Sequence, residues 1–259
     1  MPNRKAAPPL TPAQAACAAK PHVLELGGAF IECPRTLRRA KLIGLSGWAF
    51  HVVGRAGALG DVRAETVAAA LGFIAPEAVA DDWDAAWWVA MPGEVAAISL
   101  TECCRWGVEH LAHSARVTRL AELAQRVVAA ADATGLPLFA AWRAMPFPDD
   151  APGARAAVLL HLLREYFAGA SLLAVRASGM SPLEAIITGP EGEPGALAYG
   201  WQPPFPPVGP LVRRWVWAEA VTDGIAGSAF AVLDPDERME LAQLLVSAAD
   251  ARRAAPVFD

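Results

Sequence analysis

The sequence has few of the residues that build β-sheets: it contains only two tyrosines and no long run of β-branched side chains. Alanine is its commonest residue, and alanine has the highest helix propensity of all residues. The sequence therefore predicts an all-α fold, in which helix exceeds half of the residues and strand is nearly absent.

Charged residues are also scarce, at 19%, whereas hydrophobic residues make up 54% of the 259 residues. A chain this apolar buries a substantial core, which excludes disorder except at the ends. No window reaches the roughly 20 uncharged apolar residues that a spanning helix needs. The first ten residues carry Arg4 and Lys5 with no apolar stretch after them, unlike a signal peptide. We therefore expect a cytoplasmic protein without a membrane partner.

Several cofactor and metal signatures are missing. The four cysteines form no C-x-x-C pair, which favours reduced thiols over a disulfide framework. The chain lacks a P-loop, a G-x-G-x-x-G after a strand and a G-x-S-x-G nucleophile elbow. Residues 109–113 read Glu-His-Leu-Ala-His, which has neither the order nor the spacing of the zinc motif H-E-x-x-H. We expect no metal and no organic cofactor.

The net charge of −5, with scattered basic residues, gives no electrostatic footprint for nucleic acid. One short basic helix face is able to touch phosphate, but no recognition helix accompanies it. Its residues are Arg35, Arg38, Arg39 and Lys41. We expect no nucleic-acid partner.

Capping signals mark three helix starts, at residues 11–14, 181–184 and 234–237, where a capping side chain precedes a proline and then Glu or Gln. No repeat of 20 to 50 residues is visible, so a bundle is expected rather than a solenoid. Apolar periodicity predicts about eleven helices, at residues 35–44, 47–55, 62–72, 76–90, 93–113, 115–133, 136–144, 153–178, 182–188, 210–226 and 235–254. We divide the chain into an N-terminal extension and two packed helical halves, at residues 1–20, 21–145 and 146–259.

The segment 189–210 is rich in Pro and Gly and lacks periodicity. It carries Tyr199, Trp201 and Phe205, which a disordered linker has little reason to contain. A strap across the core and a lid over a substrate both account for these aromatic residues.

The apolar helix at residues 47–55 carries His51 and Arg55 one turn apart. Arginine is rarely buried without a partner. Arg55 is therefore expected to meet either a carboxylate of the chain or an anionic group on a ligand.

The long apolar helix at residues 153–178 carries His161, Arg164 and Glu165 on one face. A buried polar network explains this face. A pocket explains it equally well, if His161 or Glu165 moves a proton there while Arg164 holds an anion.

A carboxylate pair, Glu219 and Asp223, lies one turn apart on the helix after the aromatic segment. The pair is tolerable in solvent, or useful if Arg55, Arg143 or a substrate amine lies opposite.

Three blocks, at residues 47–62, 136–146 and 160–165 with its continuation 179–185, resemble a family of actinobacterial helical proteins of uncharacterised role. The resemblance covers about residues 27–245. Members carry loose helix-turn-helix-type labels, and some occur in natural-product gene clusters. Many have Gly-x-His-Leu where this chain has Gly-Ala-Ser-Leu at residues 169–172, so the resemblance implies that a site built on that histidine is absent or altered here.

The chain is also similar, with no motif that anchors the similarity, to the larger subunit of the azinomycin-type aziridine-forming pair. That enzyme cyclises an amine by expelling sulfate. The similarity implies arginines for the leaving anion and a carboxylate or histidine for the amine.

Our first hypothesis is a cofactor-independent enzyme of specialised metabolism, of the cyclase or lyase type, which acts on a small polar substrate in a cleft between the halves. The candidate catalytic residues are His51, His161 and Glu165, and the candidate substrate-binding residues are Arg55, Trp142, Arg143, Arg164 and Trp201. The alternatives are a non-catalytic ligand-binding or regulatory protein, and a scaffold subunit that docks a small partner protein through the Pro-rich segment.

Overall fold

The computed structural model describes residues 9–111, 116–148 and 151–254. Helix makes up 75% of the described residues, which contain no strand, and this confirms the all-α prediction. The α-helices of the described residues are α1 (Pro12–Gly28), α2 (Pro34–Leu42), α3 (Gly47–Ala56), α4 (Ala64–Leu71), α5 (Pro76–Ala86), α6 (Pro92–His110), α7 (Val117–Ala130), α8 (Pro137–Arg143), α9 (Pro152–Ala177), α10 (Pro182–Thr188), α11 (Gly192–Ala198), α12 (Val212–Phe230) and α13 (Pro235–Ala254).

The predicted capping signals form at all three helix starts. The hydroxyl of Thr11 accepts a hydrogen bond from the backbone N–H of Gln14 at 3.3 Å, and the Gln14 amide oxygen accepts from the Thr11 N–H at 2.9 Å. Ser181 and Glu184 form the same reciprocal pair at the start of α10. Asp234 caps α13 through its carboxylate. These side chains satisfy N–H groups that have no partner within the helix.

Two helices were not among those predicted. The start of α1 was predicted but its extent was not, and residues 12–20 of the expected N-terminal extension belong to this helix. The other, α11, interrupts the segment 189–210, where we expected no regular structure. Its sequence contains two glycines and a proline, so propensity argues against it. Its buried Ala196 packs against Ile186 and Ile187, and this tertiary packing stabilises the helix despite its low intrinsic helix propensity.

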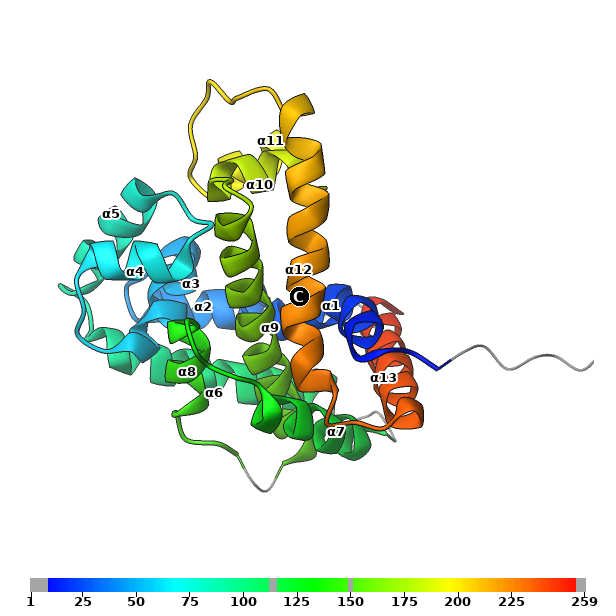
Figure 1. The fold of residues 1–259 in the computed structure, drawn as a ribbon. Coiled ribbons are helices and arrows are strands. Elements are labelled where there is room, and N and C mark those ends of the chain that lie inside the picture. Colours follow the sequence, from blue (N-terminus) through cyan, green and yellow to red (C-terminus); the bar gives the residue numbers. More distant parts are fainter. Residues whose placement is uncertain (1–8, 112–115, 149–150, 255–259) are drawn as a thin grey trace, which may run out of the picture.

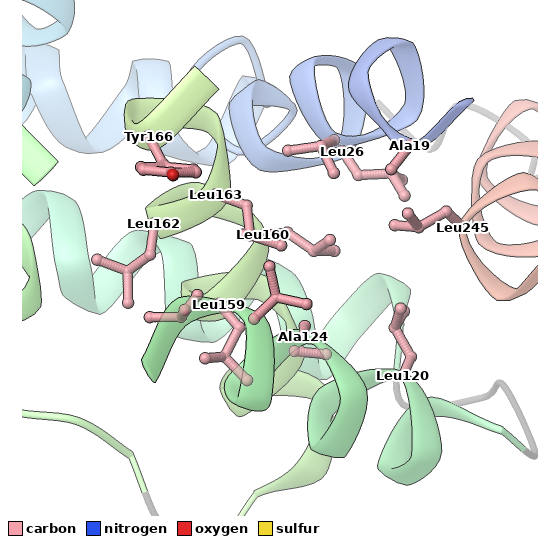
Figure 2. Packing of buried hydrophobic residues seen from close by; sticks show 14 of the residues in the cluster. Ala19, Leu26, Leu120, Ala124, Leu159, Leu160, Leu162, Leu163, Tyr166 and Leu245 are labelled. Carbon is pink, nitrogen blue, oxygen red and sulfur yellow. The ribbon is translucent and has the colours of Figure 1, made fainter. Parts of the chain in front are cut away.

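Helix α9 runs through the centre of the molecule, with α1, α6, α7, α8 and α12 packed around it (Figure 1). Leu159, Leu160, Leu162 and Leu163 point to different sides of α9 and are all buried (Figure 2). A helix that is apolar all round must be buried in protein or lipid. By length and composition α9 is able to cross a membrane, but 67% of its most apolar window is buried inside this protein. It is the core helix of the fold.

The largest hydrophobic cluster draws on both predicted halves, with residues from α1, α6, α7, α8, α9, α12 and α13. A second cluster fills the space between α3, α4 and α5 and includes Phe50 and Trp83. Residues 21–145 and 146–259 therefore share one core, and the smaller cluster lies beside it.

A close approach of α1 and α9 depends on a glycine. A Cβ atom on Gly27 would lie 2.4 Å from the carbonyl oxygen of Leu160, so no larger residue fits without moving a helix. The neighbouring Gly28 lies against the guanidinium of Arg164. The C-terminal end of α1 therefore packs directly against the polar face of α9.

Candidate functional site

A buried ion pair joins α3 to α9. Arg55 donates from Nε and Nη2 to the two carboxylate oxygens of Glu165, at 2.9 and 2.8 Å. The two side chains are 9% and 0% exposed. Two parallel hydrogen bonds to one carboxylate give the strongest and most directional form of an arginine ion pair. Of the two partners that we considered for Arg55, the structure contains the carboxylate.

Arg164 adds a second guanidinium to the same carboxylate. Its Nη1 donates to Oε1 of Glu165 at 2.8 Å, and its side chain is 16% exposed. Burial alone would raise the pKa of Glu165, but the charges of Arg55 and Arg164 outweigh burial and hold this pKa well below its usual range. Glu165 is therefore ionised at neutral pH, and the cluster of three residues carries one excess positive charge.

Some donors of this cluster remain open. Nη1 of Arg55, and Nε and Nη2 of Arg164, have no acceptor among the described residues. Both arginines line a cavity of about 340 Å³. Unpaired guanidinium donors beside a cavity are suited to binding a carboxylate, sulfate or phosphate group.

The cavity walls are mostly apolar and come from six parts of the chain: α1, α3, the end of α4 with the α4–α5 connection, α9, the stretch from α10 to Tyr199, and α12. The larger apolar and aromatic residues among them are Leu24, Leu71, Phe73, Ile74, Phe167, Ile186, Tyr199 and Trp215. An apolar cavity with a few converging polar groups is the usual form of a small-molecule site.

Acidic and basic groups also lie along the cavity. Lys20 of α1 and Glu219 of α12 both line it and form an ion pair of 2.6 Å. Glu191 is exposed, and its carboxylate has no hydrogen-bonded or ion-paired partner among the described residues. Burial, and then the charge of Glu191, raise the pKa of Tyr199, while Arg164 and Arg55 act in the opposite direction. Tyr199 thus lies within electrostatic reach of both the carboxylate and the two arginines.

A second cavity, of about 290 Å³, also touches the ion pair. Arg55 and Glu165 line it together with apolar residues of α4, α8 and α9. Since Arg55 lines both cavities, the Arg55–Glu165 pair stands between them.

Two of the candidate catalytic residues, His51 and His161, line neither cavity. The ring of His161 is fully buried, with its centroid 4.4 Å from that of Trp142 and 5.3 Å from that of Phe30. Its Nδ1 lies 3.2 Å from the carbonyl oxygen of Gly27. Burial lowers the pKa of His161 to about 4 and that of His51 to about 3, and the nearby arginines act in the same direction. Both rings are neutral at pH 7.

The candidate substrate-binding residues divide among different places. Arg55 and Arg164 line the cavity. Trp142 is buried and lines neither cavity; its indole N–H donates to the Arg55 carbonyl oxygen at 2.9 Å and so holds the end of α3 in place. Arg143 points elsewhere, since it donates to the Ala131 carbonyl oxygen at 2.8 Å and lies over the Phe139 ring.

Trp201 belongs to the strap, which we define as residues 199–208. Its indole N–H donates to the carbonyl oxygen of Phe73 at 2.8 Å, and the carbonyl oxygen of Tyr199 accepts from the N–H of Ala75 at 2.9 Å. These bonds tie the strap to the α4–α5 connection. Trp201 itself does not line the cavity, whereas Tyr199 does. The strap therefore covers the core and also forms part of the cavity wall.

Lys20, Phe73 and Trp215 line the cavity but were not among the candidate site residues, and Tyr199 was expected only as part of a strap or a lid. Glu219 was expected to be solvated or to face a cation such as Arg55 or Arg143, and its cation is Lys20 of α1. Helix α1 was not among the predicted helices, so this partner could not be predicted from the sequence.

The segment at residues 109–113 shows no metal-site geometry in the part that the structure describes. The ring of His110 stacks on Trp106, and Glu109 pairs with Arg35 and Arg105; His113 lies outside the described residues. No group of three or more His, Cys, Asp or Glu residues that could share a metal occurs in the described ranges.

Helices α2 and α3 are joined by the short turn 43–46. Seven residues of α3 are buried, Arg55 included. The basic residues Arg38, Arg39 and Lys41 lie exposed on α2. The second helix of this pair thus faces the core and carries one of the cavity arginines.

A family model described as a helix-turn-helix family matches residues 19–204, which is most of the chain. No curated protein and no solved structure matches the sequence.

Proposed function

We propose that this chain, which belongs to the helix-turn-helix family, is a ligand-binding protein that takes up a small organic anion in the cavity above Arg55 and Arg164. One observation carries the proposal: three guanidinium donors have no acceptor among the described residues, in a buried cluster with one excess positive charge beside a cavity. The Arg164 side chain is 16% exposed and lies at the cavity, so an anionic group placed there would accept charge-assisted hydrogen bonds from these donors and balance the excess charge.

The cavity also defines the rest of the ligand. A volume of about 340 Å³ suits a small metabolite. Phe73, Phe167 and Trp215 line it and offer apolar surface to the ligand body. The ligand class is therefore a carboxylate, sulfate or phosphate attached to an apolar or aromatic group.

Two features favour binding over catalysis. Glu165 is occupied by two arginines and has a lowered pKa, so it is a poor general base at neutral pH. His51 and His161 line neither cavity. Arg55 also belongs to α3, the second helix of the α2–α3 pair. A ligand held by Arg55 would therefore contact this helix pair directly. This supports the regulatory form of the binding hypothesis.

A catalytic role remains a second candidate, as a cofactor-independent cyclase or lyase that closes an aziridine ring. The observation that favours it is Glu191, an exposed carboxylate at a cavity that also contains Arg55 and Arg164. In this reaction the substrate nitrogen attacks carbon and the carbon–oxygen bond to sulfate breaks. The bonding electrons leave with the sulfate held by the arginines, and the nitrogen proton passes to Glu191.

Nucleic acid is not part of the proposal. Helix α3 is largely buried, and α5 carries four acidic side chains, Glu77, Asp81, Asp82 and Asp84, which would repel phosphate.

The test uses two probes of nearly equal shape, 2-naphthoate and the neutral 2-naphthamide, titrated by calorimetry. We expect the acid to bind and the amide to bind at least tenfold more weakly, a difference of about 1.4 kcal/mol. Arg164→Met should weaken binding of the acid by a similar factor. Arg213→Ala, which removes the same charge from an exposed position on α12, should leave it unchanged. Equal binding of acid and amide, or no effect of Arg164→Met, would contradict the proposal, as would the failure of a panel of aromatic carboxylates, sulfonates and phosphates to bind.

A further inference from the structure

The cavity that contains Arg55 and Arg164 extends along α9. Arg164, Ala168, Ser171 and Val175 all line it, and residues at these spacings lie on one side of a helix. At about 1.5 Å of rise per residue, they extend over about 16 Å of the helix axis. The cavity therefore has a cationic end at Arg164 and a distant end near Val175.

Ser171 lies towards the distant end, and its hydroxyl has no hydrogen-bond partner among the described residues. Serine and threonine hydroxyls inside helices often donate to a carbonyl oxygen of the preceding turn. In this chain Thr101, Thr222 and Ser247 do so, at 2.9, 2.8 and 2.8 Å. The hydroxyl of Ser171 departs from this pattern at the wall of a cavity, so it is available to a ligand.

Trp215 of α12 brings a second hydrogen-bonding group to the same end. It lines the cavity and packs against the hydrophobic cluster that contains Val175. Its indole N–H has no acceptor among the described residues, whereas those of Trp142 and Trp201 donate to carbonyl oxygens at 2.9 and 2.8 Å. The Ser171 hydroxyl and the Trp215 N–H both belong to half-buried side chains and are both accessible to solvent.

We infer that the ligand carries a hydroxyl or carbonyl group at the end remote from its anionic group, and that Ser171 and Trp215 bind this second group. The inference rests on the proposed function, because the two arginines fix the position of the anion. A ligand hydroxyl is able to accept from the indole N–H and donate to the serine, and a ligand carbonyl is able to accept from both.

The position of Ser171 also sets the length of the ligand. Ser171 follows Arg164 by seven residues, which corresponds to about 10 Å along α9. Phe167 and Ala168 line the cavity between these two positions, so the part of the ligand that joins the polar groups is apolar. The ligand class is therefore an aromatic or arylalkyl acid with a hydroxyl or carbonyl group at its far end.

The test compares 2-naphthoate with 6-hydroxy-2-naphthoate, which differ by one hydroxyl at the end remote from the carboxylate. In calorimetric titration we expect the hydroxy acid to bind the wild-type chain about three- to tenfold more tightly, as one net hydrogen bond provides. Ser171→Ala should reduce this preference by weakening the binding of the hydroxy acid alone. Trp215→Phe keeps an aromatic wall but removes the N–H, and should reduce the preference in the same way.

Ser178→Ala is the matched control on the same helix. The Ser178 hydroxyl donates to the Val175 carbonyl oxygen at 2.7 Å and does not line the cavity, so this variant should keep the preference. Unchanged affinity for 2-naphthoate in Ser171→Ala shows that the cavity is intact.

Equal binding of the two acids to the wild-type chain would overturn the inference, and so would a preference that survives either Ser171→Ala or Trp215→Phe. In these cases, binding of 2-naphthoate that depends on Arg164 would still support the proposed function. If neither acid binds the wild-type chain, the proposed function and the inference fail together.

Discussion

Arg55 and Glu165 are 110 residues apart in the chain, and they form a buried pair with two hydrogen bonds of 2.9 and 2.8 Å. The pair ties α3 to the core helix α9 and stands between two cavities. Arg164 is the third member of the cluster, bound by a single hydrogen bond. The difference between the two arginines leads to the first prediction.

Removing Arg55 should cost far more stability than removing Arg164. In Arg164→Ala, Glu165 keeps both bonds to Arg55 and the excess positive charge disappears, so the free energy of unfolding should change by less than about 1 kcal/mol. In Arg55→Ala, Glu165 retains one bond in a buried site, and the loss should be about 3 to 5 kcal/mol. Urea unfolding of both variants measures the difference. Equal destabilisation by the two substitutions would contradict this prediction, because it would show that Arg164 contributes as much to stability as Arg55.

The close packing of α1 on α9 predicts a large effect of a single methyl group. Gly27→Ala places a Cβ 2.4 Å from the Leu160 carbonyl oxygen, and the forced movement should cost about 1 to 3 kcal/mol. Gly93→Ala is the matched control, because a Cβ there meets nothing within 4 Å. Thermal unfolding should show a lower Tm for the first variant and an unchanged or higher Tm for the second. A neutral Gly27→Ala would contradict the observed packing.

The buried histidines predict a loss of stability in mild acid. In the folded chain the pKa of His161 is lowered from 6.5 to about 4, and that of His51 from 6.5 to about 3. Below pH 6.5 the unfolded chain therefore takes up protons that the folded chain does not, so stability falls as the pH falls. His161 alone should remove about 3 kcal/mol between pH 6.5 and 4, at about 1.4 kcal/mol per pKa unit.

Urea unfolding at pH 7, 6, 5 and 4 measures this loss. The lowered pKa of Glu165 acts in the same direction below pH 4.5, because the unfolded carboxylate is protonated first. His161→Asn should make the dependence between pH 6.5 and 4.5 shallower, whatever its effect on stability at pH 7. An unchanged slope in this variant would mean that His161 takes up its proton in the folded state as readily as in the unfolded chain, and so that its pKa is not lowered.

The strap predicts a local effect. Trp201→Phe removes the hydrogen bond to the Phe73 carbonyl oxygen and should cost about 1 kcal/mol of global stability. Because the bond holds the strap on the α4–α5 connection, limited proteolysis should cleave the strap faster in this variant, while α9 stays protected. Gln202→Ala changes the exposed neighbouring residue and should leave the cleavage rate as it was.

The local features of this protein followed from the sequence by itself. Thr11, Ser181 and Asp234 mark helix starts correctly because a cap is made between residues three positions apart. The burial of α9 follows from its composition, since a helix that is apolar on every side is stable only when it is buried on every side. That Arg55 and Glu165 need partners was also visible, because charges in apolar helices must be compensated.

Only the tertiary structure decided which groups meet. Trp142 and Arg143 are consecutive, yet Trp142 donates a hydrogen bond to the Arg55 carbonyl oxygen and Arg143 donates one to the Ala131 carbonyl oxygen. They have different partners because successive residues on a helix point about 100° apart. Lys20 meets Glu219 across 199 residues, and Tyr199 reaches the cavity because Trp201 is bonded to Phe73. Such contacts depend on how whole helices pack. The local sequence shows that Arg55 must be paired, and the position of α9 decides that its partner within the protein is Glu165.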